Sequence, residues 1–558
     1  MPLAPLLGFD SAGAPLLNTR LSGDEASTQP DDEVIRRLGL ASPLLLALPE
    51  AVANQKPTGD HASILQSSNC IVGPYAAEEA VKAREWLGAG AVYALVCAPA
   101  AANASQLAER VTRLAGDAAI PNDRLLLLLN VPSLADASDV ERVRSEVTAL
   151  AAKTGAGCYE CCRPESVGIC SGVVIVVPPD TPYARATTAK INSRHARHAL
   201  SLSLTPPMHL SLPRSPSRTE ELLERIAPIA TKDRLQIFLA NLPSAGVATV
   251  GHLHHMSMHY IATAALGPSA SAPDPPPPPA LTPAASCMTR LFTAPPLDLG
   301  PCIVSCVRTD RSDGLFPTLV LETDGTALGL VYSSPDSISA ALRCGRGVYW
   351  SRSRQSLWRK GDTSGAWQTL RRIRLDCDAD ALAFTVSQHG VPPAFCHKGS
   401  LSCWGQASGL PALVLTLRQR QASAPVGSYT KRLFDDATLL RNKLVEEAQE
   451  LAEATEPDHV AAEAADLLYF ALVRCVAAGV GIEAVEAHLD RRALNSALKG
   501  RRPGNDKAER IEAANAILAK SKAKECGKCA PSRMRRLAPL AAAAVAAAAF
   551  AVRSSLKK

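Results

Sequence analysis

Cysteine is too sparse in this sequence to staple a small secreted scaffold. There are 16 cysteines in 558 residues, whereas disulfide-rich domains concentrate several in each short stretch. The N-terminus, MPLAPLLGFD, has no basic segment and is followed by acidic residues from Asp10 onward, which argues against a signal or transit peptide. We therefore expect a reducing, cytoplasmic environment, in which clustered cysteines either bind metal or are buried thiols.

Long apolar runs are also scarce. Residues 537–552, LAPLAAAAVAAAAFAV, are apolar, flanked by basic residues and rich in alanine. This run is shorter than the ~20 residues with which a helix crosses a bilayer. Two interpretations stand: an Ala-rich tail helix, and a short C-terminal membrane anchor with basic flanks.

Repeats of glycine or of charge are missing, which excludes collagen-like and coiled-coil architectures. A hydrophobic content of 47% supports several buried cores and excludes wholesale disorder. The net charge is +6, but from Lys499 onward there are 15 Lys and Arg against 4 Asp and Glu. The body before Lys499 is therefore mildly acidic, and we expect no nucleic-acid partner; the basic tail favours a membrane surface.

Residues 1–265 alternate apolar segments with amphipathic ones. Continuous apolar strands separated by helices predict parallel strands covered on both faces, so we expect an α/β domain of unknown role, in the form of a degenerate β/α barrel. The expected strands are Leu44–Leu48, Cys70–Gly73, Ala91–Ala98, Arg124–Val131, Val173–Val177 and Arg234–Leu239. Helices are expected from Glu78, Val140 and Glu220.

Composition divides the rest of the chain into four parts. Residues 266–288 are rich in proline and predict a semi-rigid linker. Residues 289–420 have the pattern of a mainly-β α+β domain. Residues 428–505 have a strongly helical pattern and predict an all-α domain. Residues 506–558 form a basic tail that contains the apolar run 537–552.

A segment beginning at Asp376, DCDADALAF, places three carboxylates at alternate positions. In an extended strand, Asp376, Asp378 and Asp380 would share one face, with Cys377 on the other. Hard carboxylate oxygens suit Mg²⁺. The alternative is an acidic turn without metal.

Three cysteines in and after this segment are candidate metal ligands. Cys377, Cys396 and Cys403 would supply three zinc ligands and leave one position open for water, as catalytic zinc sites do. Zinc lowers the pKa of a bound water to about 7, and His397 is placed to act as general base. Buried thiols without metal are the alternative.

The segment GRGVYWSRSRQSLWRKGDTSG, residues 345–365, offers guanidinium groups, hydroxyls and glycines that can cradle a phosphate. The candidate substrate-binding residues there are Arg352, Arg354, Trp358, Lys360 and Ser364. Together with VRTDRSDGLFPTLV, GLVYSS, DCDADAL and FCH…SCWG, it resembles phosphoribosyl-AMP cyclohydrolase. The resemblance implies a homodimer with Zn²⁺ near the subunit interface, the Mg²⁺ and Zn²⁺ ligands named above, and hydrolytic opening of the adenine ring of phosphoribosyl-AMP.

Carboxylates are also spaced along two expected helices. Glu447 with Glu450, and Glu463 with Asp466, each share a helix face, and like charges at this spacing favour a bound cation. A solvated acidic face is the alternative. The segment SYTKRLFDD…KLVEEAQELAEA…EAADLLYFALV resembles phosphoribosyl-ATP pyrophosphohydrolase. The resemblance gives these four residues to Mg²⁺ and makes Glu446 the candidate base.

The order of the two resemblances matches the N-terminal part of the fungal multifunctional histidine biosynthesis protein. We therefore expect a bifunctional hydrolase acting on phosphoribosyl-ATP and then on phosphoribosyl-AMP. The alternatives are a general nucleotide pyrophosphatase and a pathway scaffold with a membrane-tethering tail. Lys443, Arg491 and Arg492 are candidates to neutralise the triphosphate, although ordinary helix-surface charge explains them equally well.

Three other clusters of cysteine or histidine are weaker indications of metal binding. Incidental thiols explain the cysteine groups Cys158–Cys170 and Cys526–Cys529 better than metal binding does. The histidine-rich segment 251–260, GHLHHMSMHY, is expected to be a polar loop before the linker rather than a soft-metal site.

Overall fold

A computed structural model provides the structure. It describes residues 3–9, 15–16, 31–40, 44–47, 57, 64–65, 69–151, 170–178, 217–232, 235–242, 246–262, 264–265, 296–405 and 408–496. Cys158, Cys161, Cys162, Cys526, Cys529, the proline-rich segment 266–288 and the tail 506–558 lie outside these residues.

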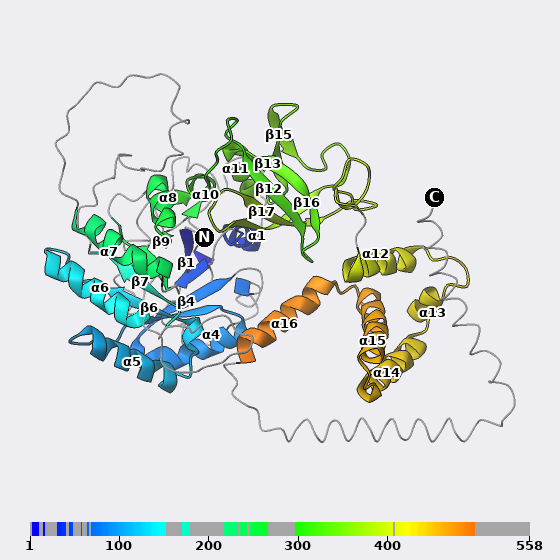
Figure 1. Cartoon of the computed structure of the whole chain (residues 1–558), viewed down its shortest axis with the longest axis horizontal. Helices are drawn as coiled ribbons and strands as arrows, with labels where there is room; N and C mark the ends of the chain where they lie inside the picture. The colour runs from blue at the N-terminus through cyan, green and yellow to red at the C-terminus, as the bar shows by residue number, and fades with distance from the viewer. Residues whose placement is uncertain are drawn as a thin grey trace. The chain divides into compact units, whose positions relative to one another are not determined.

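The N-terminal region is an α/β domain, as expected. Its parallel strands pair in chain order, and β1 pairs with both β3 and β9, so the sheet closes on itself (Figure 1). The strands are β1 (Leu3–Phe9), β3 (Leu44–Ala47), β4 (Cys70–Tyr75), β5 (Tyr93–Cys97), β6 (Leu125–Asn130), β7 (Gly172–Val176), β8 (Gln236–Ala240) and β9 (Met258–Ala262). A short β2 (Pro15–Leu16) pairs antiparallel with β1.

Helices connect successive parallel strands, as crossover connections require. They are α1 (Asp31–Leu38), η1 (Ala77–Lys82), α4 (Ala83–Ala89), α5 (Ala104–Asp117), η2 (Asn122–Arg124), α6 (Ala137–Ala151), α7 (Arg218–Lys232) and α8 (Val247–His255). All six expected strands are present, within three residues at each end. The polar loop expected over 251–260 is wrong: these residues end α8 and form most of β9, because Leu253, Met258 and Tyr260 are buried.

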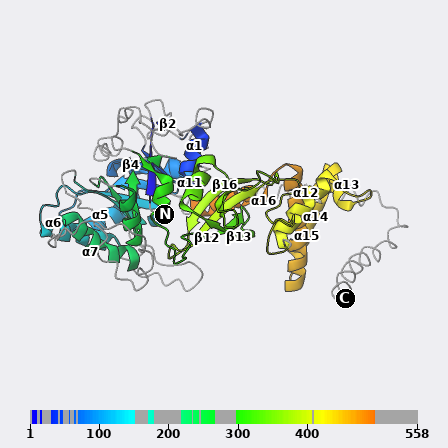
Figure 2. The ribbon, with the colours of Figure 1, turned by 90° about the horizontal axis from the view of Figure 1, so that it is seen from above.

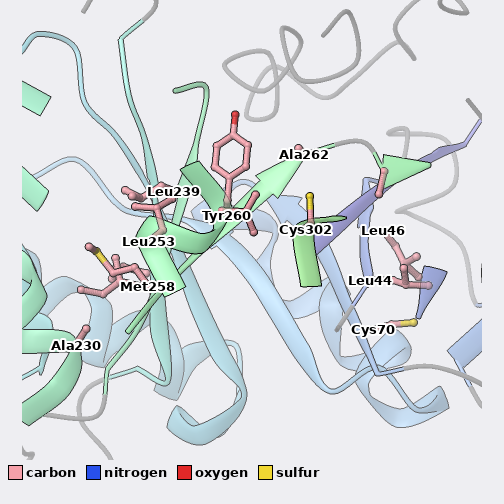
Figure 3. Close-up of a cluster of buried hydrophobic side chains, with 14 of the residues drawn as sticks. Leu44, Leu46, Cys70, Ala230, Leu239, Leu253, Met258, Tyr260, Ala262 and Cys302 are labelled. Atoms are coloured by element: carbon pink, nitrogen blue, oxygen red, sulfur yellow. The ribbon is translucent and has the colours of Figure 1, made fainter. Parts of the chain in front are cut away.

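Side chains of the strands alternate between two hydrophobic layers. In β6, Leu126 and Leu128 belong to the cluster inside the sheet, with Val174 and Phe238. Leu125, Leu127 and Leu129 instead join the larger cluster beneath the helices. Figure 3 shows part of this larger cluster, where Leu239, Met258 and Tyr260 lie beside Leu253. Strands buried on both faces account for the continuous apolar runs in the sequence.

The middle region is rich in sheet. Its four-stranded sheet has the order β13-β12-β17-β16, with β12 parallel to β17 and the other pairs antiparallel. The elements are β10 (Ala264–Ala265), β11 (Leu297–Asp298), α10 (Leu299–Val304), β12 (Phe316–Glu322), β13 (Ala327–Ser333), α11 (Pro335–Cys344), β14 (Val348–Ser351), β15 (Ser356–Arg359), β16 (Gln368–Leu375) and β17 (Leu382–Gln388). Ser334 caps α11 by accepting a hydrogen bond from Ser337, and Gly345 ends the helix in the left-handed conformation.

The C-terminal region is helical: α12 (Gly409–Ala422), α13 (Tyr429–Asp435), α14 (Ala437–Glu453), α15 (Pro457–Ala477) and α16 (Ile482–Ser496). Helices α14 and α15 lie side by side (Figure 2). The mainly-β pattern expected for residues 289–420 is wrong from residue 409, where α12 begins. Val414 and Leu417 of α12 share a core with Leu433 and Phe470, so we propose that the helical domain starts near residue 409 rather than at 428.

Candidate membrane spans were sought among the described helices. None of them alone has the length and apolar composition of a span. The pair Pro457–Ala477 and Ile482–Ala493 meets these criteria together, but it is bent by 109°. The apolar run 537–552 lies outside the described residues, so the anchor and the tail helix both remain predictions.

Candidate active sites

The three aspartates predicted to bind Mg²⁺ lie close together. Ligand oxygens of Asp376, Asp378 and Asp380 are all within 4.8 Å of one another. The extended strand expected here is wrong: these residues form the turn between β16 and β17. Asp376 accepts hydrogen bonds from the amides of Asp380 and Ala381, at 3.0 and 3.1 Å. This turn gathers three carboxylates on one side of the chain.

The carboxylates of this turn influence one another's protonation. A hydrogen bond with Asp376 and the charges of Asp378 and Asp376 raise the pKa of Asp380. Burial opposes but does not outweigh the amide and side-chain hydrogen bonds that lower the pKa of Asp376. Crowded carboxylates of this kind are the arrangement that a hard divalent cation relieves.

Two arginines and a tyrosine lie in the same domain, and the sequence singled out only one of the three. The guanidinium carbons of Arg311 and Arg352 are 4.5 and 4.2 Å from the ring centroid of Tyr332. Asp313 holds Arg311 through two contacts of 2.9 and 2.6 Å. The neighbouring Asp310 contributes to raising the pKa of Asp380, so this segment faces the aspartate turn. Arg311 lies in the segment VRTDRSDGLFPTLV, which contributes to the family resemblance, but the sequence assigned it no role.

The predicted zinc thiols are only partly brought together. Cys396 and Cys403 are neighbours, since each affects the other's pKa. A hydrogen bond from the Lys398 amide and one from Ser400 lower the pKa of Cys396, which favours the thiolate that zinc requires. Burial, and then Cys396, raise the pKa of Cys403. His397 Nδ1 lies 3.9 Å from Cys396 Sγ.

Cys377 does not join this pair. Among the described residues, the groups of three potential ligands with atoms within 4.8 Å are the aspartate turn and one helical group; the three cysteines are not among them. The amide of Cys403 bonds to Leu328 of β13 at 2.8 Å, two strands away from β17. Cys377 precedes β17 in the turn, at the end of the sheet. One chain therefore offers two adjacent thiols and a third elsewhere.

Lys360, predicted to bind phosphate, is buried, with 5% of its surface exposed. Its Nζ donates to the carbonyl oxygens of Ala366 and Ala394, at 3.3 and 3.2 Å, and lies 5.6 Å from the ring centroid of Phe395. Burial lowers the pKa of Lys360, and the nearby Cys403 and Cys396 oppose that effect. The two thiols thus lie close enough to the ammonium to affect its pKa.

A buried hydrogen-bond chain holds the loop beside Lys360. Tyr349 donates to Gln368 Oε1 at 2.7 Å, and Gln368 Nε2 donates to Gln388 Oε1 at 2.9 Å. Gln388 Nε2 in turn donates to the carbonyl oxygen of Ala366 at 3.1 Å. The carbonyl oxygen of Ala366 therefore accepts hydrogen bonds from both Gln388 and Lys360.

The other residues of the predicted phosphate cradle are scattered. Arg352 and Arg354 are exposed on the turn between β14 and β15. Trp358 packs against the hydrophobic core, with its ring 5.9 Å from that of Tyr349. Ser364 accepts a hydrogen bond from the Ala366 amide at 3.3 Å. Arg352, Arg354 and Ser364 are exposed, and their role in binding phosphate stays a prediction.

The helical carboxylates form the second group. Glu447 of α14 and Glu463 and Asp466 of α15 have ligand oxygens within 4.8 Å of one another. Glu447 is buried, with 5% exposed. Oε2 of Glu463 is buried and has no hydrogen-bond partner among the described residues, whereas Oε1 pairs with His459 at 3.0 Å. A buried carboxylate oxygen without a partner fits a cation site.

Lys443 lies at the edge of this group. Its Nζ is 3.0 Å from Glu446 and 2.9 Å from Glu447. Burial would lower the pKa of Lys443, but its hydrogen bonds to Glu447 and Glu446 raise it above the usual value. Glu450 is not one of the three close ligands, yet burial and the charges of Glu447 and Glu463 raise its pKa.

The two other cations proposed for the triphosphate lie on α16. Arg491 is half-buried and Arg492 is exposed. Neither forms an ion pair with another residue that the structure describes. Their role in binding phosphate stays a prediction.

Two family models match adjacent parts of the chain. The family model for phosphoribosyl-AMP cyclohydrolase matches residues 329–405, and that for phosphoribosyl-ATP pyrophosphohydrolase matches residues 410–493. The aspartate turn and the thiols fall within the first match, and the helical carboxylates fall within the second.

Curated relatives match the same part of the chain. The chain is 54% identical over 192 residues to the histidine biosynthesis trifunctional protein of Komagataella pastoris, covering 34% of this chain and 22% of that protein. It is 53% identical over 194 residues to the histidine biosynthesis bifunctional protein of Schizosaccharomyces pombe, covering 35% and 46%. It is 35% identical over 216 residues to the histidine biosynthesis bifunctional protein HisIE of Parasynechococcus marenigrum, covering 35% and 96%. The chain thus spans less than half the length of the two fungal relatives and nearly all of the cyanobacterial one.

Proposed function

Because this chain belongs to the family of the histidine biosynthesis bifunctional protein HisIE, we propose that it is a bifunctional hydrolase of histidine biosynthesis, acting at steps two and three. It would hydrolyse phosphoribosyl-ATP to phosphoribosyl-AMP and pyrophosphate, and then open the adenine ring of phosphoribosyl-AMP. The observation that carries the proposal is the presence of a three-carboxylate group inside each of two adjacent family matches.

The helical site would perform the first step. Glu447, Glu463 and Asp466, supported by Glu450, are the residues that would hold Mg²⁺, which when bound neutralises phosphate charge. Glu446 is exposed beside them and would accept the proton of the water that attacks the α-phosphorus. Pyrophosphate leaves as the bond to the α-phosphorus breaks. Lys443 already pairs with Glu446 and Glu447, so its charge is directed at these carboxylates rather than at the triphosphate.

The second step would take place at the sheet-rich domain. Asp376, Asp378 and Asp380 are the residues that would hold Mg²⁺, and the thiols would hold Zn²⁺, which when bound makes a water ligand acidic near neutral pH. His397 would take the proton from the water that attacks C6 of the adenine ring. Cleavage of the N1–C6 bond then opens the ring. Arg352 and Arg311 both contact the ring of Tyr332, and together they would bind a substrate phosphate.

A second copy of the chain would complete the thiol site. The amide of Cys403 is bonded to Leu328 of β13, two strands away from β17, whereas Cys377 lies in the turn before β17. Thiolate ligands lie about 2.3 Å from a zinc ion, so sulfurs that share one ion lie at most about 4.6 Å apart. Among the described residues, one chain does not bring the three thiols this close. We propose that Cys377 of one subunit meets Cys396 and Cys403 of the other in a homodimer.

An apolar patch on the sheet supports a second copy as the occupant. Leu319 and Leu330 are cross-strand partners on β12 and β13, and they are 36% and 53% exposed. Leu330 follows Leu328 and Gly329, against which Cys403 lies. If Leu319 and Leu330 packed against the same two residues of a second subunit, the thiol region of one subunit would lie next to the other subunit.

A coupled assay on the purified full chain tests both activities. Phosphoribosyl-ATP with Mg²⁺ and Zn²⁺ should give pyrophosphate and the ring-opened product. Cys403→Ala should stop at phosphoribosyl-AMP, and Glu447→Ala should leave the substrate intact. Cys475→Ala in α15 is the matched control and should behave as wild type.

Ordinary nucleoside triphosphates separate this function from a general pyrophosphatase. Wild type should prefer phosphoribosyl-ATP. Faster hydrolysis of ATP than of phosphoribosyl-ATP, or ring opening by Cys403→Ala at the wild-type rate, contradicts the proposal.

A further inference from the structure

Lys360 is a buried cation without a carboxylate partner. It is 5% exposed and forms no ion pair with an Asp or Glu among the residues that the structure describes. Two carbonyl oxygens accept hydrogen bonds from its Nζ, which leaves one of its three N–H donors over. A buried ammonium is costly unless negative charge lies nearby, so its position calls for an anionic neighbour.

The thiols are that neighbour. Ala394, whose carbonyl oxygen lies 3.2 Å from the Lys360 Nζ, is two residues before Cys396. Phe395, whose ring centroid lies 5.6 Å from the same Nζ, packs against Gly329. Cys403 Sγ lies on Gly329 as well, 3.2 Å from where a Cβ would stand. Through Ala394, Phe395 and Gly329, the ammonium and the two thiols therefore belong to one packed group.

Charge explains why a cation is useful at this place. Three thiolates around one Zn²⁺ leave a net charge of about −1 on the site, and a buried negative charge is stabilised by a fixed positive one. The hydrogen-bond chain through Gln388 holds the Ala366 carbonyl that positions Lys360. The fold thus fixes the ammonium in place before any metal binds.

We propose that Lys360 is a positioning residue whose buried ammonium stabilises Cys396 and Cys403 as zinc ligands, and that it does not bind substrate phosphate. This inference rests on the proposed zinc site. It assigns Lys360 a role toward the metal ligands, whereas its sequence context had suggested a phosphate cradle.

Zinc affinity of the full chain tests the proposal. Lys360→Gln keeps hydrogen-bond donors for the two carbonyl groups but removes the charge, and Lys360→Met removes both. Competition with a zinc chelator should show binding at least about tenfold weaker for both variants. The matched control is Lys398→Met, which removes an exposed and solvent-screened charge next to Cys396 and should change affinity less than about twofold.

Two further measurements exclude a merely structural role. Thermal unfolding of the metal-free Lys360→Gln protein should occur at or above the wild-type temperature, because hydrogen-bond donors are kept and a buried charge is removed. Its KM for phosphoribosyl-AMP at saturating zinc should also be unchanged. Wild-type zinc affinity in Lys360→Gln together with a raised KM would overturn the inference and restore the phosphate role.

The outcome for wild type separates this inference from the proposed function. If wild type neither binds zinc nor opens the adenine ring, the proposed site fails and the inference fails with it. If wild type does both and Lys360→Gln binds zinc equally well, the inference alone fails.

Discussion

The ammonium of Lys443 lies 2.9 Å from Oε1 of Glu447, one turn away on α14. This pair places a cation at the edge of the carboxylates that would hold Mg²⁺. A protein cation and a metal cation compete for the same negative charge. The electrostatics of the helical site therefore depend on Lys443 before metal enters.

Removal of Lys443 should tighten Mg²⁺ binding. In Lys443→Met, the half-saturating Mg²⁺ concentration for pyrophosphate release is expected to fall several-fold, because the competing charge is gone. Lys431→Met is the matched control, since Lys431 pairs with Asp435 on the exposed face of α13 and should have no effect. A higher Mg²⁺ requirement in Lys443→Met would show that the lysine supports the metal instead.

Two inactive variants should restore ring opening when mixed. Cys377→Ala and Cys403→Ala each lack one thiol, but a mixed dimer has one complete site if Cys377 comes from the second subunit. Random exchange should then recover about a quarter of wild-type activity. The measurement is phosphoribosyl-AMP turnover after subunit exchange. The double variant Cys377→Ala/Cys403→Ala mixed with Cys403→Ala provides the baseline, because no dimer in that mixture has a complete site. No recovery in the first mixture would contradict a shared site.

His254 should make the barrel domain sensitive to acid. Burial, and then the charges of His255 and Arg308 among others, lower the pKa of His254 to about 4. The unfolded chain has a pKa near 6.5 at this residue, so between these values the unfolded state binds more protons. Stability is therefore lost as pH falls from about 6.5 to about 4.

Replacement of His254 should reduce this loss. Between pH 7 and pH 4.5, the midpoint temperature of thermal unfolding should fall less in His254→Gln than in wild type. His252→Gln, at an exposed position of the same helix α8, should fall as wild type does. An equal loss in His254→Gln and wild type would count against the assigned pKa.

A methyl group at Gly347 should disrupt the buried hydrogen-bond chain. A Cβ there would clash with Oε1 of Gln368 and lie 2.9 Å from the hydroxyl of Tyr349. Gly347→Ala is expected to lower the free energy of unfolding of this domain by about 2 kcal/mol. Gly116→Ala in α5, where a Cβ meets nothing within 4 Å, should instead stabilise by about 0.5 kcal/mol. Chemical denaturation of both variants makes the comparison.

Strongly patterned elements could be predicted from the sequence. The six apolar strands and the helices α6 and α7 were foreseen because burial on both faces of a sheet, or on one face of a helix, leaves a periodic signal. The helix expected from Glu78 is present as the short η1 and α4. Strand β9 was mistaken for a loop because His259 lies between the buried Met258 and Tyr260. Its polarity hid the pairing that closes the sheet with β1.

The metal ligands were foreseen as residue types but not as geometry. Spacing identified the three aspartates, yet a turn rather than a strand gathers them, because the Asp376 side chain binds two amides within its own loop. Spacing also could not reveal that Cys377 lies apart from Cys396 and Cys403. Arg311 was missed because its contact with Tyr332 depends on the pairing of β12 and β13, which only the folded chain shows.

The chain of hydrogen bonds from Tyr349 to Ala366 has a direction. The hydroxyl of Tyr349 donates its one proton to Gln368 Oε1. Each glutamine of the chain therefore turns its oxygen toward Tyr349 and its nitrogen toward Ala366. Neither glutamine can rotate alone without placing two donors or two acceptors face to face. The carbonyl oxygens of Ala366, Trp367 and His389 can only accept, so they fix this order from the end beside Lys360. Tyr349→Phe would therefore leave the order intact and take one buried donor away from Gln368 Oε1.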